Sequence, residues 1–154
     1  MRTPPASADP AEIKLWDLAQ RRERPALKEK STAVSSPCFL DNGRTLASAG
    51  LDRGVRFWDV EAGILRSSLP VRQDAILSFA ANKDGQTLAL GCQDRTVKLW
   101  DVRSGQPRAV FVGHTREVNA VAFSGDGRFL GTGSGVNSDW WVKGGEVKIW
   151  KADE

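Results

Sequence analysis

Short stretches in which apolar and charged residues alternate recur along the whole chain. The clearest end in tryptophan, at Trp16, Trp58, Trp100 and Trp150, with spacings of 42, 42 and 50 residues. In each stretch an apolar, a basic and a second apolar residue precede the tryptophan. Alternation of this kind is typical of a half-buried strand, and a period near 42 is typical of stacked four-stranded sheets. The pattern therefore predicts a stack of similar β-sheets, and it favours binding over catalysis.

Each of the last three tryptophan strands follows an apolar strand, an Asn/Asp-Gly turn, a strand of small residues and a turn that contains aspartate. The turns Asn42-Gly43, Asp84-Gly85 and Asp126-Gly127 are expected to supply the positive φ angles of tight hairpins. Pro25 interrupts the single helix candidate, around residues 19–30. The predicted strands are 12–17, 24–28, 33–39, 45–50, 55–59, 64–69, 75–81, 87–92, 97–101, 108–112, 118–123, 128–134 and 146–150.

The Gly113-His114 pair, the VNAVAFSGDGRFL segment that follows it and the VKLWD-type strands resemble the WD-repeat β-propeller family. The resemblance covers nearly the whole chain after about residue 6. It implies an all-β fold of four-stranded antiparallel blades, of which this chain would be a partial propeller. We expect residues 1–10 to be unstructured or the remnant of a truncated repeat. Residues 11–154 are expected to form the partial propeller, with units ending at the four tryptophans.

The resemblance also implies a hydrogen-bonded set in each blade, made of a histidine, a serine or threonine, an aspartate and the tryptophan. Lys30 and Arg72 stand where two of the histidines are expected, and Leu90 replaces a serine or threonine. The insertion at residues 136–145, which contains Asp139, leaves the last acid unassigned. A cation facing the acid could still form a charge-assisted bond with it. Carried over to this chain, the structural blade network comprises Ser48, Asp52, Trp58, Asp94, Trp100, His114, Thr132 and Trp150.

Composition narrows the possible functions. The chain has 154 residues, of which 40% are hydrophobic and 27% charged, with a net charge of +3, as in a globular protein. The basic run from Arg21 to Lys30 is diluted by Glu23 and Glu29, which makes nucleic-acid binding unlikely. Cys38 and Cys92 are expected to be small buried thiols rather than a disulfide framework.

No enzyme signature is found in the sequence. It has no phosphate-binding loop, no nucleophile elbow and no His/Cys cluster at metal-ligand spacing. We therefore expect no catalytic residue, no cofactor and no metal. No apolar stretch is long enough to span a membrane, and the first residues do not form a secretory signal. These features predict a cytoplasmic protein.

The insertion places Trp140 beside Trp141, and tryptophan is enriched at binding hot spots. The alternative is that one or both rings fold back and cap the blade. In the geometry of the family this turn shares one face with the loops that enter the blades. The candidate partner-binding residues are Arg53, Arg72, Arg95, Arg116, Trp140 and Trp141. An aromatic, arginine-rich face suits an acidic protein or peptide.

The two ends lead to a further expectation. Met1 falls inside a repeat, and the chain stops four residues after Trp150, without an outer strand. Unpaired sheet edges favour association, so either an upstream portion is missing or the chain self-associates, with residues 24–28 of one copy completing another copy's last blade. The leading function is a noncatalytic scaffold for protein interaction. The alternatives are a sensor module of a bacterial-type signalling protein and a propeller that binds a small ligand.

Overall fold

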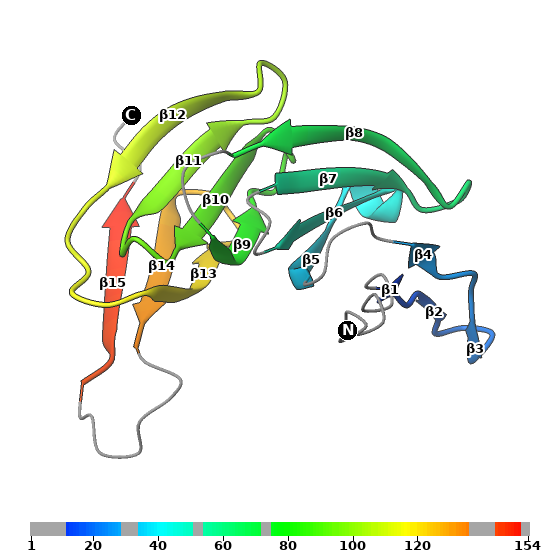
Figure 1. Ribbon diagram of the computed structural model, residues 1–154, viewed down its shortest axis with the longest axis horizontal. Helices are drawn as coiled ribbons and strands as arrows, with labels where there is room; N and C mark the ends of the chain where they lie inside the picture. Colours follow the sequence, from blue (N-terminus) through cyan, green and yellow to red (C-terminus); the bar gives the residue numbers. More distant parts are fainter. Residues whose placement is uncertain (1–11, 29–33, 51–53, 72–74, 136–143, 152–154) are drawn as a thin grey trace, which may run out of the picture.

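The computed structural model describes residues 12–28, 34–50, 54–71, 75–135 and 144–151, which form a row of antiparallel sheets (Figure 1). Two sheets have four strands each, with every strand hydrogen-bonded to its neighbours in chain order. The first contains β5 (Val34–Leu40), β6 (Thr45–Gly50), β7 (Gly54–Asp59) and β8 (Ile64–Pro70). The second contains β9 (Ile76–Ala81), β10 (Thr87–Cys92), β11 (Val97–Asp101) and β12 (Gln106–Phe111). The predicted all-β class with four-stranded antiparallel sheets is confirmed.

The third sheet has three strands, β13 (Val118–Phe123), β14 (Phe129–Ser134) and β15 (Glu146–Lys151). In the described residues β15 pairs only with β14, so it is an edge strand. This sheet stands at one end of the row, and the first described strands stand at the other (Figure 1).

The first described strands form a hairpin of two short pairs, which we call the N-terminal hairpin (residues 12–28). Its strands are β1 (Glu12–Ile13), paired with β4 (Leu27–Lys28), and β2 (Trp16–Asp17), paired with β3 (Arg22–Glu23). The sequence predicted two continuous strands here. Pro25 has no N–H to donate to a ladder, and this explains the break between β3 and β4. A bond from the Arg24 amide to the Leu15 carbonyl (2.8 Å) bridges the two pairs.

Equivalent residues occupy the same register in all three larger sheets. The tryptophan of the third strand lies opposite a leucine of the second strand: Trp58 opposite Leu46, Trp100 opposite Leu88 and Trp150 opposite Leu130. Because side chains alternate between the faces of a strand, one register gives every sheet the same two faces. The sequence repeat is therefore a repeat of packing surfaces.

These faces build the core. We call the face that carries the first apolar residue of each tryptophan strand (Val55, Val97) the forward face, and the face that carries the tryptophan the rear face. The forward face of the first sheet packs on the rear face of the second, where Val55 joins Leu88 and Leu90 in one buried cluster. The second sheet packs on the third in the same way, with Val97 and Leu130 in one cluster.

The N-terminal hairpin extends this order of packing. Ile13, Leu15 and Leu27 form its forward face and cluster with Leu46 and Trp58 on the rear face of the first sheet. Leu27 is completely buried. Each described unit therefore covers the rear face of the next unit along the chain.

The aspartates that follow the tryptophans stabilise the turns after the third strands. Asp59 accepts the amides of Glu61 and Ala62, and Asp101 accepts the amide and hydroxyl of Ser104. The bonds from Ala62 and from Ser104 hold the pKa of each carboxyl below its ordinary value. The recurrence of the acid is thus explained by turn geometry rather than by catalysis.

The Asn/Asp-Gly turns differ from the two-residue hairpins predicted from sequence. Asn42 and Gly43 both have the predicted positive φ, but they belong to η1 (Asp41–Gly43), a single 3-10 turn. In the other two turns only Gly85 and Gly127 have positive φ. The preceding aspartate instead accepts an amide two residues further on, from Gln86 in the first of these turns (2.7 Å). A side chain that bonds locally in this way replaces the second left-handed residue.

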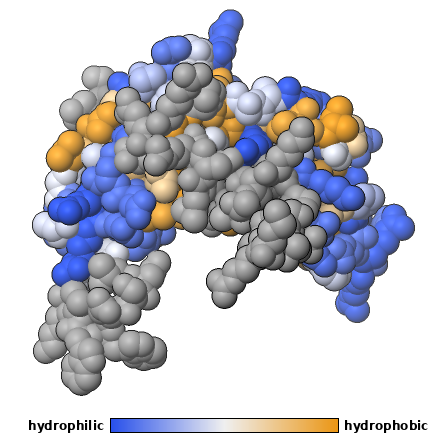
Figure 2. All heavy atoms as spheres, in the orientation of Figure 1, coloured by the Kyte–Doolittle hydropathy of each residue, from blue (hydrophilic) through white to orange (hydrophobic). Residues whose placement is uncertain are grey.

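Apolar side chains also reach the outer rim. Figure 2 shows apolar atoms over β8 and over β12. Ile64 is 58% exposed on β8, and Val110 is 52% exposed on β12. Single exposed apolar groups of this kind are normal on protein surfaces. No helix within the described ranges has the length and apolar character needed to cross a membrane.

Candidate functional site

The most complete polar cluster lies in the third sheet, around His114. Its ring is buried in the loop before β13, where Nε2 lies 2.7 Å from the hydroxyl of Thr132 on β14. The Trp150 indole on β15 donates to the same hydroxyl at 2.9 Å. Nδ1 of His114 lies 3.3 Å from Glu146, the first residue of β15. One loop and two strands thus meet in a single hydrogen-bonded set.

One direction of donation satisfies all these groups. The Trp150 N–H donates to the Thr132 oxygen, the Thr132 hydroxyl donates to Nε2 of His114, and Nδ1–H donates to Glu146. This assignment uses both ring nitrogens of His114. Every polar atom of the ring therefore holds neighbouring strands together, and neither nitrogen is left for proton transfer.

Glu146 is the acid that the sequence left unassigned in this set. It also accepts the hydroxyl of Thr115 at 2.8 Å and the amide of Thr115 at 3.3 Å. The bond from the Thr115 hydroxyl is the main reason that the pKa of Glu146 lies below its ordinary value of 4.5, while partial burial acts in the opposite direction. Glu146 therefore ties the loop before β13 to the start of β15.

Replacing Glu146 by glutamine should destabilise the protein at neutral pH and remove part of its acid sensitivity. A carboxyl whose pKa is lowered in the folded state contributes stability above its unfolded pKa and loses it as pH falls through the folded value. The difference in unfolding free energy between Glu146→Gln and the unmodified chain should therefore shrink below about pH 4.5. Urea melts between about pH 7 and about pH 3 measure this.

A second variant separates charge from shape. Thr115→Val keeps the shape of the side chain and removes the hydroxyl that donates to Glu146. It should lose part of the same pH-dependent stability. Parallel pH curves for Glu146→Gln and the unmodified chain would contradict a structural role for the charge.

In the first sheet the structure shows the tryptophan and the serine of the predicted hydrogen-bonded set. The Trp58 indole donates to Ser48 at 2.9 Å, and both residues are buried. Asp52, the acid predicted for this unit, lies outside the described residues, as does Lys30. What the structure establishes here is the bond between β7 and β6.

The second sheet departs from the pattern in two ways. Leu90 stands where the other sheets have Ser48 or Thr132, and the Trp100 indole N–H is buried without a hydrogen-bond partner in the described part of the chain. Asp94, in the turn before β11, forms an ion pair with Lys98 of β11, with 2.9 Å between Nζ and the carboxylate. One cation beside Asp94 is thus a lysine of β11. Arg72, the residue predicted to face it, lies outside the described residues.

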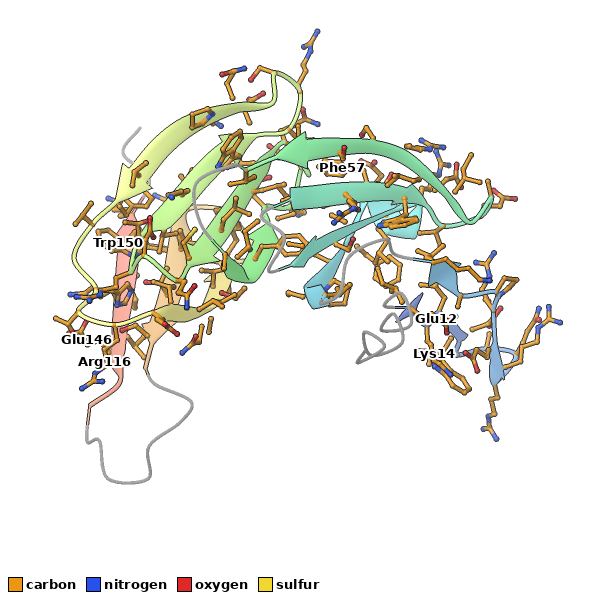
Figure 3. All side chains as sticks on the ribbon, viewed as in Figure 1. Glu12, Lys14, Phe57, Arg116, Glu146 and Trp150 are labelled. Carbon is orange, nitrogen blue, oxygen red and sulfur yellow. The ribbon has the colours of Figure 1, made fainter. Side chains whose placement is uncertain are left out.

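Two of the six candidate partner-binding residues can be placed. Arg95 is exposed in the turn between β10 and β11, and Arg116 is half-buried in the loop before β13. A bond from Gln93 to Glu117 (3.3 Å) joins this turn to this loop, so both arginines lie at the same end of the sheets. Figure 3 shows Arg116 beside the end of β15 at which Glu146 lies. Arg53, Arg72, Trp140 and Trp141 lie outside the described residues.

The end of the sheets that carries Arg95 and Arg116 is a charged surface. Within the described residues neither Arg95 nor Arg116 has a side-chain hydrogen bond or ion pair, whereas Lys98 is held by Asp94. The described residues contain no group of three or more histidines, cysteines or acids that could hold a metal ion. Cys92 is buried and Cys38 is half-buried, and both are free thiols.

Comparison with known families identifies the repeat. The family model described as "WD domain, G-beta repeat" matches residues 24–59, 63–101 and 105–151, which is more than half of the chain. The matched segments contain the three larger sheets and β4 of the hairpin. No curated protein matches the chain.

Proposed function

The chain belongs to the WD-repeat family, and we propose that it is a noncatalytic scaffold that binds another protein or a peptide. One observation carries this proposal. The single histidine of the chain has both ring nitrogens engaged, with Thr132 and with Glu146, inside a structural set. A general acid or base needs a nitrogen that can reach a substrate, and His114 has none to spare.

We propose further that the partner is acidic and that it binds at the end of the sheets that carries Arg95 and Arg116. Two guanidinium groups that have no partner among the described residues can form bidentate bonds with carboxylates. Arginine is also enriched at interfaces, where lysine and the acids are depleted. Three described acids of the second and third sheets lie at this end, Asp94, Glu117 and Glu146, and all three accept hydrogen bonds from the chain itself.

A short acidic probe tests this proposal. Fluorescein-labelled oligoglutamate should bind the unmodified chain at low salt, as measured by anisotropy. The double variant Arg95→Glu/Arg116→Glu should weaken its binding by about tenfold or more, which corresponds to about 1.4 kcal/mol. Added salt should weaken the binding of the unmodified chain, because exposed charges are screened.

The matched control is Arg103→Glu, compared with the single variant Arg95→Glu, because each changes the net charge by the same amount. Arg103 is an exposed arginine in the turn that follows β11, whereas Arg95 lies in the turn that precedes it. This variant should change probe affinity less than about twofold at the same salt concentration. An equal loss in both variants would mean that net charge, and not this end of the sheets, attracts the probe. Failure of the unmodified chain to bind would contradict an acidic partner.

A further inference from the structure

The forward face of the last sheet is apolar and exposed. Val147 and Ile149 on β15 are 81% and 73% exposed, although each is the apolar residue of an alternating strand. In register they lie beside Gly133 and Gly131 of β14. The small residues Ala120, Ala122, Gly131 and Gly133 complete this face. The last sheet therefore presents a flat apolar surface beside a free strand edge.

The same positions of the second sheet are buried against a neighbour. Val97, the equivalent of Val147, is completely buried. At Gly91, the equivalent of Gly133, an added Cβ would lie 2.7 Å from the carbonyl oxygen of Val118 in the next sheet. The forward face thus works as a contact surface on which another sheet approaches to backbone distance. At Gly133 an added Cβ would meet only Ala120, at 3.5 Å.

A complementary surface is exposed at the other end of the molecule. The rear face of the N-terminal hairpin carries Trp16, which is 60% exposed, whereas the equivalent Trp58 is 4% exposed. Lys14 lies on the same face and is paired with Glu23 at 3.3 Å. Rear faces in this chain pack against forward faces, and the hairpin's rear face has no such neighbour among the described residues.

We propose that the forward face of the last sheet binds the rear face of the N-terminal hairpin of a second copy of the chain. The occupant is a second copy because the chain repeatedly packs a rear-face tryptophan against the forward face of another unit, and Trp16 is the rear-face tryptophan of the hairpin. The interface is head-to-tail, so two copies form a ring if the rotation closes and a longer assembly if it does not. It is separate from the arginine end of the sheets and does not depend on the acidic partner.

Charge and strand pairing agree with this arrangement. Lys98, the equivalent of Lys14, is 6% exposed inside the internal interface, where its charge is paired with Asp94. A buried lysine is therefore tolerated at this position between two packed sheets when an acid pairs with it. The hairpin binds as a unit, because Leu27 of β4 is completely buried within its own chain. This differs from the exchange of residues 24–28 that the sequence suggested, since no strand has to leave its partner.

Light scattering over a dilution series tests the proposal. The unmodified chain should have a mass above that of one copy, rising with concentration. Ile149→Asp places a charge on the apolar face and should weaken self-association by about tenfold or more. Ile64→Asp, at an isoleucine of β8 that is 58% exposed, is the control and should leave self-association unchanged. Val147→Asp repeats the test at the neighbouring exposed position, and urea melts verify that each variant is folded.

A mixing experiment tests the pairing of the two faces. Trp16→Glu should weaken self-association as Ile149→Asp does. Each of these variants keeps one intact face, so an equimolar mixture should form a species of two copies and nothing larger. Arg95→Glu/Arg116→Glu should self-associate like the unmodified chain, which separates this proposal from the acidic partner.

Three results would overturn the proposal. The unmodified chain could remain a single copy at every concentration. Ile64→Asp could dissociate the assembly as strongly as Ile149→Asp. The mixture of Trp16→Glu and Ile149→Asp could stay monomeric, in which case the two faces do not bind each other.

Discussion

Replacing Trp58 by alanine is expected to lower the unfolding free energy by about 3–5 kcal/mol. The side chain is 4% exposed and fills the space between the first sheet and the N-terminal hairpin, in contact with the cluster of Leu15, Leu27 and Leu46. Its removal also takes away the donor that bonds Ser48 at 2.9 Å. Domains of this kind have about 5–15 kcal/mol of stability in total, so the variant should unfold at a clearly lower urea concentration.

Two further variants divide this effect into its parts. Trp58→Phe keeps most of the apolar volume and loses the N–H, so it should lose less stability than Trp58→Ala. Trp16→Ala removes the equivalent ring of the hairpin, which is 60% exposed. At a protein concentration low enough for single copies it should change stability by about 0.5 kcal/mol or less. Equal losses at Trp16 and Trp58 would contradict the burial of Trp58 between the two units.

The sheets were predictable from sequence because the repeated tryptophan strand shows both the order of the sheets and which face of a sheet each residue occupies. Apolar residues one and three positions before each of the four repeat tryptophans set the alternation, and the tryptophan repeat sets the order of the units. The hairpin was harder to predict. The same alternation extends through Trp16, but Pro25 interrupts the pairing partner and leaves two short ladders.

The acids of the blade network were only partly predictable. Asp94 lies six residues before Trp100, and a search for aspartate at this spacing finds none before Trp150. Glu146 lies four residues before Trp150, and its longer side chain reaches both His114 and Thr115 from this different position. The sequence feature that could have identified this acid was the glutamate directly before the alternating apolar residues of β15.

The partner of Asp94 could also have been found from the repeat. A basic residue stands two positions before each of the four repeat tryptophans, and Lys98 is one of these. Alternation places it on the rear face with Trp100, and it is 6% exposed there. A basic residue in an alternating strand suggests a solvated face, whereas this one is held inside by an ion pair (2.9 Å). Sequence pattern shows which face a residue shares but not whether another sheet covers that face.

Replacing Gly91 by alanine is expected to destabilise the protein by about 1–3 kcal/mol, although alanine usually stabilises a strand relative to glycine. The added Cβ would lie 2.5 Å from the Ser78 hydroxyl and 2.7 Å from the Val118 carbonyl. The hydroxyl can rotate away, but the carbonyl belongs to β13 and moves only if the third sheet moves. The variant should therefore loosen the contact between the second and third sheets, and urea melts measure the loss.

Gly133→Ala is the matched control, because the two glycines occupy the same position in successive sheets. Its Cβ would meet only Ala120, at an ordinary contact distance of 3.5 Å. In dilute solution it should be neutral or should stabilise the single copy by up to about 1 kcal/mol. A loss of stability at Gly133 equal to that at Gly91 would mean that strand geometry, and not the neighbouring sheet, requires the glycine.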